Sequence, residues 1–124
     1  MKKKILITLL SLFTFVTLSF ADSGYVYKGK IGNYPVVVTL WATAAYASGE
    51  YYYVSQGPYK TLQLEGVNRG YYWDFTETLY GDFNGSFRLK WNLATRTGYK
   101  TVTGTYTDLK GKTYKVVLNC IRLL

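Results

Sequence analysis

Large apolar and polar side chains alternate along this sequence with a period of two residues, which is the spacing of a β-strand with one buried face. The alternation is plainest in residues 71–80, where Tyr71, Trp73 and Phe75 fall on one side and polar residues separate them. Clusters of Gly, Asn, Asp and Pro divide the chain into eight such segments, which predicts a strand for each. The expected strands are 25–31, 34–42, 48–55, 61–66, 71–80, 85–92, 99–107 and 113–123.

The connections between these segments are short, as in "GN", "VNRG" and "DLKGK", and they indicate sequential hairpins. We therefore predict an all-β fold, a single antiparallel up-and-down meander of about eight strands that closes into a small barrel. The residues expected to face its core are Tyr25, Tyr27, Ile31, Val36, Val38, Leu40, Tyr51, Tyr53, Leu62, Leu64, Tyr71, Trp73, Phe75, Leu79, Phe87, Leu89, Trp91, Val102, Tyr106, Tyr114, Val116, Leu118 and Cys120.

Glycines share the inward face of several strands, two positions before a large core residue. They are Gly29, Gly49, Gly85 and Gly104. An inward glycine permits a bend, a close backbone approach or room for a neighbouring aromatic ring, as the closure of a small barrel requires.

The first 21 residues have the pattern of a signal peptide. Lys2, Lys3 and Lys4 precede an apolar run at 5–20, and Ser19-Phe20-Ala21 offers small residues around a cleavage site. Sixteen residues fall short of the roughly 20 that a membrane-spanning helix needs, although an uncleaved anchor is the alternative. We predict a signal peptide at 1–21, a β-barrel-like domain at 22–124, and an exported protein that is periplasmic or secreted.

The charge of the chain favours acidic partners. The formal net charge is +8, and it falls to about +5 without the three leader lysines. An acidic polymer, a glycan or a protein fits this charge, whereas nucleic acid is disfavoured because the sequence has no signature for binding it. The single cysteine, Cys120, cannot form a disulfide within the chain and is expected to be a small buried side chain. The sequence leaves the oligomeric state open.

Residues for catalysis are scarce. Histidine is absent, the acidic residues are scattered, and one cysteine cannot build a thiolate zinc site. No catalytic residue, metal ligand or cofactor is therefore assigned. Glu77 is the exception that alternation places on the core face. Either a bulge after Phe75 turns it outward, or it lies near a barrel end and pairs with a basic or tyrosine side chain. A ligand-binding or catalytic carboxylate at the barrel mouth is the remaining alternative.

Aromatic residues make up 19% of the chain, with 14 tyrosines, and some fall on outward faces or in loops. Tyr46, Tyr59, Tyr80 and Tyr99 lie in or beside loops. Outward aromatic rings suit contacts with sugar rings or proteins. The structural alternative is that outward aromatic pairs stabilise the sheet and that outward lysines form a solvent-exposed face that protects strand edges. The candidate binding surface comprises Trp41, Tyr52, Tyr72, Arg88, Lys90 and Lys115.

The stretches "YKGKIGNYPVVVTL", "SGEYYYVS", "LQLEG", "FTETLYGDFNGSF" and "GTYTDLKGKTYKVVL" resemble small exported bacterial β-domains of uncharacterised function. The match covers residues 27–118 and departs from the pattern in the alanine-rich "WATAAYASG" connection. The resemblance implies a β-barrel-like fold and export, and it brings no activity. The meander is also similar in architecture to avidin, lipocalin and lysozyme-inhibitor barrels, but a fold does not fix a function.

These observations favour an exported, non-enzymatic binding module that presents aromatic and basic residues to an envelope glycan, an anionic polymer or a protein. The alternative is an inhibitor of a secreted or host hydrolase. A carrier of a small apolar ligand is the third hypothesis, and a carboxylate enzyme ranks last.

Overall fold

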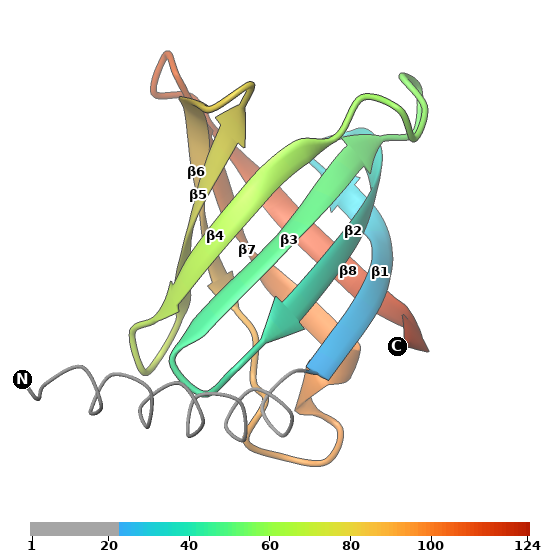
Figure 1. Cartoon of the computed structure of the whole chain (residues 1–124), viewed down its shortest axis with the longest axis vertical. Coiled ribbons are helices and arrows are strands. Elements are labelled where there is room, and N and C mark those ends of the chain that lie inside the picture. The colour runs from blue at the N-terminus through green and yellow to red at the C-terminus, as the bar shows by residue number, and fades with distance from the viewer. Residues whose placement is uncertain (1–22) are drawn as a thin grey trace, which may run out of the picture.

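A computed structural model describes residues 23–124, so the predicted signal peptide and its cleavage site lie outside the described residues. Eight antiparallel strands each pair with the next, and the last returns to pair with the first, which closes a barrel (Figure 1). The predicted all-β meander and its closure are thus confirmed. The strands are β1 (Ser23–Ile31), β2 (Tyr34–Ala42), β3 (Tyr46–Tyr53), β4 (Leu62–Asn68), β5 (Trp73–Leu79), β6 (Asp82–Lys90), β7 (Thr101–Asp108) and β8 (Thr113–Leu123). Over residues 23–124, no helix has the length and apolar character needed to cross a membrane.

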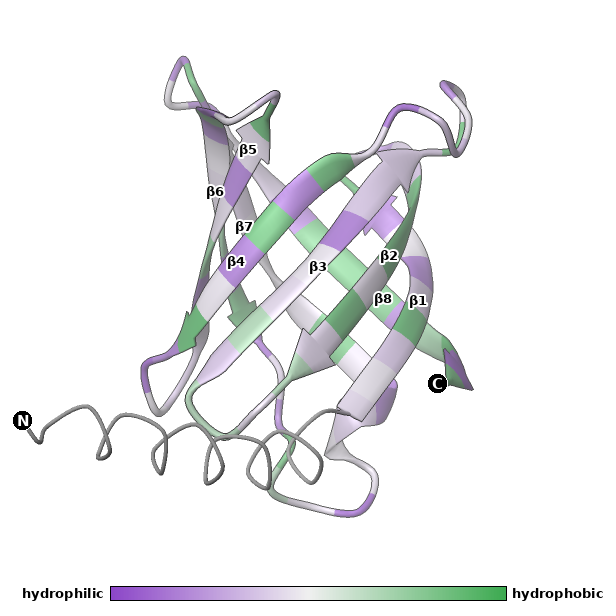
Figure 2. Ribbon diagram, in the orientation of Figure 1, coloured by the Kyte–Doolittle hydropathy of each residue, from purple (hydrophilic) through white to green (hydrophobic). Residues whose placement is uncertain are grey.

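The two-residue alternation gives the barrel its core, as predicted. Figure 2 shows apolar and polar residues alternating along strands such as β4. The inward aromatic rings pack against one another, with ring centroids 5.0 Å apart for Trp73 and Trp91 and 4.7 Å apart for Phe87 and Tyr106. Because these rings fill the interior, hydrophobic burial and aromatic packing stabilise the fold, without a disulfide.

The prediction that Tyr71 faces the core is wrong. Its side chain is 95% exposed, because β5 begins two residues later, at Trp73. Gly70 adopts a positive φ of 102°, and its N–H donates to the side-chain oxygen of Asn68 at 2.9 Å, so the chain is still turning at this point.

The inward glycines allow close approach, as the sequence predicted. A Cβ atom at Gly49 would meet the backbone carbonyl oxygen of Thr39 on β2. At Gly85 it would meet the hydroxyl of Tyr106, so the absence of a side chain there lets this ring lie over β6 and reach Glu77 on β5.

The two ends of the barrel differ. At one end, which we call the covered end, residues 91–100 connect β6 to β7 and contain a short 3₁₀ helix, Gly98–Lys100. The Trp91 indole N–H donates to the Tyr27 hydroxyl at 2.7 Å, and Tyr27 donates to the carbonyl of Tyr99 at 2.7 Å, which ties this connection to the core. The opposite end, uppermost in Figure 1, carries the connections β1–β2, β3–β4, β5–β6 and β7–β8, and we call it the open end.

Candidate functional site

Glu77 is a buried carboxyl group near the open end, and only 1% of its surface is exposed. It accepts hydrogen bonds from the hydroxyls of Tyr51 and Tyr106, the latter at 3.2 Å, and from the side-chain amide of Asn84. The prediction that Glu77 lies near a barrel end and pairs with tyrosine is therefore confirmed. The alternative of a bulge after Phe75 is wrong, because the register shift falls between Glu77 and Thr78 and leaves Glu77 facing inward.

Both tyrosines that bind Glu77 remain protonated donors. Burial, reinforced by the neighbouring Glu77, raises the pKa of Tyr51 and of Tyr106 well above the ordinary tyrosine value. Within residues 23–124 Glu77 forms no ion pair, so neutral donors alone satisfy its oxygens. A negative charge at this position would lack a nearby compensating cation.

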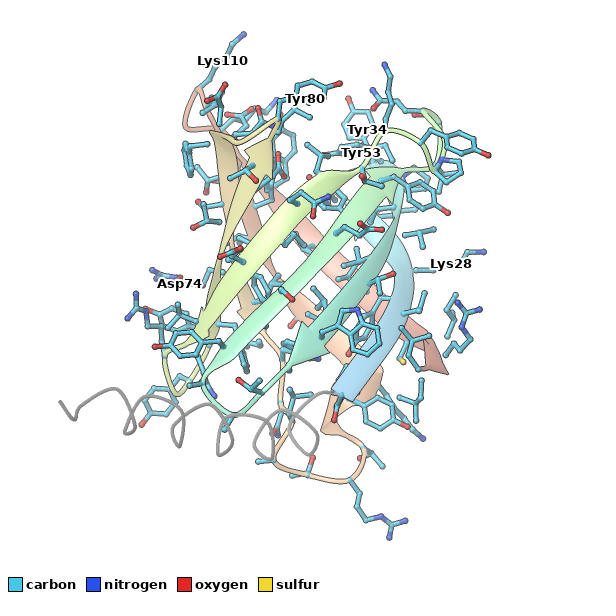
Figure 3. The ribbon with its side chains drawn as sticks, viewed as in Figure 1. Lys28, Tyr34, Tyr53, Asp74, Tyr80 and Lys110 are labelled. Atoms are coloured by element: carbon cyan, nitrogen blue, oxygen red, sulfur yellow. The ribbon has the colours of Figure 1, made fainter. Side chains whose placement is uncertain are left out.

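A cavity of about 330 Å³ opens at this end of the barrel. Four of its lining residues are tyrosines from different strands: Tyr34 on β2, Tyr53 on β3, Tyr106 on β7 and Tyr114 on the neighbouring β8. Ring centroids lie 6.3 Å apart for Tyr34 and Tyr53, and 6.1 Å apart for Tyr106 and Tyr114. Figure 3 shows Tyr34 and Tyr53 at the same end as Tyr80 and Lys110. The cavity is therefore an aromatic pocket, with Tyr106 linking it to Glu77.

Asp108 also lines this pocket. One carboxylate oxygen accepts the backbone N–H groups of Lys112 and Lys110, each at 2.9 Å, and the other accepts the Tyr114 hydroxyl at 3.3 Å. The backbone N–H of Lys112, more than any other contact, lowers the pKa of Asp108. Asp108 is thus an ionised carboxylate at neutral pH, beside the aromatic walls.

Exposed apolar side chains lie at the same end as the pocket, and at least one lies in or immediately beside every connection there. We call these the tip residues: Tyr34, Val54, Tyr59, Tyr80, Phe83 and Leu109. Tyr80 has a φ of 54° and is 93% exposed. Among residues 23–124 it is the one non-glycine residue with a positive φ, a conformation in which an ordinary side chain is strained.

The structure brings together part of the surface that the sequence proposed. The guanidinium of Arg88 lies 4.2 Å from the ring centroid of Tyr72, and its Nε is 3.6 Å from a carboxylate oxygen of Asp74. Asp74 also pairs with Arg69 at 3.3 Å. Arg88 therefore has partners within the chain for both its charge and its planar face.

Two other proposed residues, Lys90 and Lys115, lie near Arg88 on the outer face of β6 to β8, whereas Trp41 and Tyr52 lie apart from it. Trp41 pairs with Ser48 and Tyr52 with Val37, so these two aromatics are separated along the β2–β3 pair. Lys115 lies two strands from Arg88, with Thr105 between them. Lys90 follows Arg88 by two residues on β6 and also lines a groove at the covered end. Trp41 and Arg88 both line a shallow outer groove of about 1200 Å³, the one feature that connects them.

The pocket was not predicted as a site. Tyr53, Tyr106 and Tyr114 were assigned to the core, and neither Tyr34 nor Asp108 was singled out. The "TDLKGK" turn held one usable signal, because an aspartate before a glycine-containing turn commonly accepts backbone N–H groups there. In the part of the chain that the structure describes, no three Cys, Asp or Glu side chains gather as metal ligands would.

No family model, curated protein or solved structure matches this chain.

Proposed function

We propose that this chain is an exported, non-enzymatic binding module that docks a protein partner through the tip residues at the open end. The observation that supports this most directly is the presence of an exposed apolar side chain in or immediately beside every connection at that end. Tyrosine and phenylalanine supply large contact areas at low entropy cost and are frequent in protein interfaces. Export is the part of the proposal that rests on the leader pattern of the sequence.

The strained conformation of Tyr80 supports a binding role for the tip residues. It precedes Gly81, which has a φ of 86°, in a two-residue turn between β5 and β6. Asn, Asp or Gly would occupy the first position of such a turn with less strain. A tyrosine that is strained and almost fully exposed does not stabilise the fold, so a contact outside the chain is the simplest reason for its presence.

A protein fits this end better than an anionic polymer does. Binding to a polyanion requires a continuous row of free cations. Lys90 lies two residues from Arg88 and Lys115 two strands from it, but Arg88 itself is engaged by Asp74 and Tyr72, which interrupts the row. A hydrolase would be one such protein partner, which keeps the inhibitor hypothesis within this proposal.

The interior offers little support for the enzyme or carrier hypotheses. The oxygens of Glu77 are closed off from solvent and engaged by three donors. Aromatic side chains fill the core, which leaves a pocket of about 330 Å³, near the lower limit of ligand-pocket volumes.

The test is affinity capture from cell-envelope extract and culture medium with the tagged full chain. A tip variant, Tyr59→Ser/Tyr80→Asn/Phe83→Ser, is compared with a control, Tyr46→Ser/Tyr71→Ser, because Tyr46 and Tyr71 are exposed aromatics away from the open end. We expect one protein to be captured by the wild type and the control and lost by the tip variant. Equal capture by the tip variant would overturn the proposal.

Salt dependence separates the polymer alternative. Captured material that is released by moderate salt and lost on Arg88→Gln/Lys115→Gln, while the tip variant retains it, would favour an anionic polymer instead.

A further inference from the structure

We infer that the open-end pocket binds an organic ammonium group, and that the group comes from a lysine side chain of the docked protein. The inference deepens the proposed function and rests on it for the source of the lysine. The chemistry of the pocket itself is argued from the residues that line and underlie it.

The walls of the pocket suit a cation. Four tyrosines contribute to a cavity of about 330 Å³, and their rings come from strands on opposite sides of the mouth. The face of an aromatic ring carries partial negative charge, so several rings around one space form a cage that attracts an ammonium group. Because the cavity lies near the lower limit of ligand-pocket volumes, it fits the end of a side chain better than a whole metabolite.

Two carboxyl groups at this end also favour a cation in the pocket. Asp108 lines it directly, and backbone N–H groups hold this carboxylate in its ionised form. Glu77 lies behind Tyr106, which lines the pocket and donates its hydroxyl hydrogen to the Glu77 carboxyl group. Neither Glu77 nor Asp108 forms an ion pair within residues 23–124, so no basic side chain of this part of the chain is already paired with either carboxyl group.

A lysine of the chain itself already lies against one of these rings. The ammonium nitrogen of Lys112 is 5.3 Å from the ring centroid of Tyr114. This contact is a second, independent sign that the rings at this end attract ammonium groups. The positive net charge of the chain opposes a cationic partner only weakly at physiological salt, where exposed charges beyond about 8 Å are screened.

The direct test is a pair of small probes of nearly equal shape, Nα-acetyl-lysine amide and Nα-acetyl-norleucine amide. Each is titrated into the full chain, and binding is followed through the NMR shifts of the tyrosine ring protons. We expect the lysine amide to bind with a millimolar Kd and the norleucine amide to bind about tenfold more weakly or not at all. Equal binding of the two amides, or no binding of either, would overturn the inference. Tighter binding of glucose than of the lysine amide would overturn it in favour of a sugar pocket.

Matched variants assign the binding to the pocket. Asp108→Asn retains an oxygen for the turn but removes the charge, and we expect several-fold weaker binding of the lysine amide. Asp82→Asn makes the same change at an exposed open-end position outside the pocket lining and should leave the Kd unchanged. Lys112→Gln should strengthen binding, because it removes a competing ammonium group. If Asp82→Asn weakened binding as much as Asp108→Asn, the binding would depend only on the overall charge of this end, and its assignment to the pocket would be wrong.

The two proposals fail separately. If the lysine amide does not bind but the tip variant loses its captured protein, the docking surface stands and the ammonium pocket is wrong. If the lysine amide binds but the tip variant still captures the protein, the pocket stands and docking through the tip residues is wrong. If Asp108→Asn weakens both events, the pocket receives a group of the captured protein.

Discussion

At the scale of single residues, Glu77 shows how this barrel accommodates a buried carboxyl group. Its position follows from alternation along β5, and its three donors come from β3, β6 and β7. Removing one donor leaves an oxygen without its partner inside the core, and a buried acceptor that is left unsatisfied costs about 1–3 kcal/mol. Tyr51, which supplies one of these bonds, is itself almost fully buried.

We therefore predict that Tyr51→Phe lowers the free energy of unfolding by about 1–3 kcal/mol. The adjacent Tyr52 points to the outer face and is half-buried, so Tyr52→Phe should change stability by less than about 0.5 kcal/mol. Urea unfolding followed by tryptophan fluorescence measures both. Similar losses for the two variants would show that the Glu77 network does not stabilise the fold.

At the scale of elements, the turn of the β5–β6 hairpin exposes a tyrosine ring at a cost in folding stability. Its turn places Tyr80 at a positive φ, which costs an ordinary residue about 1–2 kcal/mol. Asn tolerates this conformation better because its short polar side chain can bond locally.

We predict that Tyr80→Asn raises the free energy of unfolding by about 0.5–1 kcal/mol and at the same time weakens capture of the protein partner. Chemical denaturation measures the first effect, and the capture assay measures the second. Tyr59→Asn, in the β3–β4 connection, is the control for removal of an exposed tyrosine outside this turn. A destabilised Tyr80→Asn variant would mean that the tyrosine ring contributes to the fold.

The elements also show what the sequence could and could not predict. Alternation and short turns were sufficient for the order of strands and the inward position of Glu77, because these depend on neighbouring residues. The exposed Tyr71 was missed, because the two-residue period cannot indicate where a strand starts when a turn precedes it.

The pocket was missed for a different reason. It combines side chains from β2, β3, β7 and β8, and their meeting depends on strand register and on the missing side chain at Gly85. Neither is visible in a local pattern. The candidate surface had the same weakness: residues that share an outward direction were grouped as one surface, but Tyr52 lies on β3, three strands from Arg88 on β6.

At the scale of the whole molecule, the stability of the barrel depends on buried tyrosine hydroxyls at both ends remaining protonated. At the covered end, burial raises the pKa of Tyr27, which bonds Trp91 and the Tyr99 carbonyl. At the open end, burial raises the pKa values of Tyr51, Tyr53 and Tyr106. In the unfolded chain the same groups ionise near pH 10. The unfolded state thus loses protons there that the folded state still holds.

Stability is therefore unaffected by these groups below about pH 10 and falls as the pH rises above it. Each such tyrosine contributes a slope of about 1.4 kcal/mol per pH unit, so we predict a steep alkaline transition in which unfolding and tyrosine ionisation coincide. Urea midpoints measured at a series of alkaline pH values, together with tyrosinate absorbance, test this. Tyr27→Phe should reduce the slope by about one proton, whereas Tyr59→Phe, at a position 96% exposed, should leave it unchanged. Ionisation of all the tyrosines while the barrel remains folded would contradict the burial of these hydroxyls. It would also contradict the packed interior, which leaves the open-end pocket as the accessible part of the barrel core.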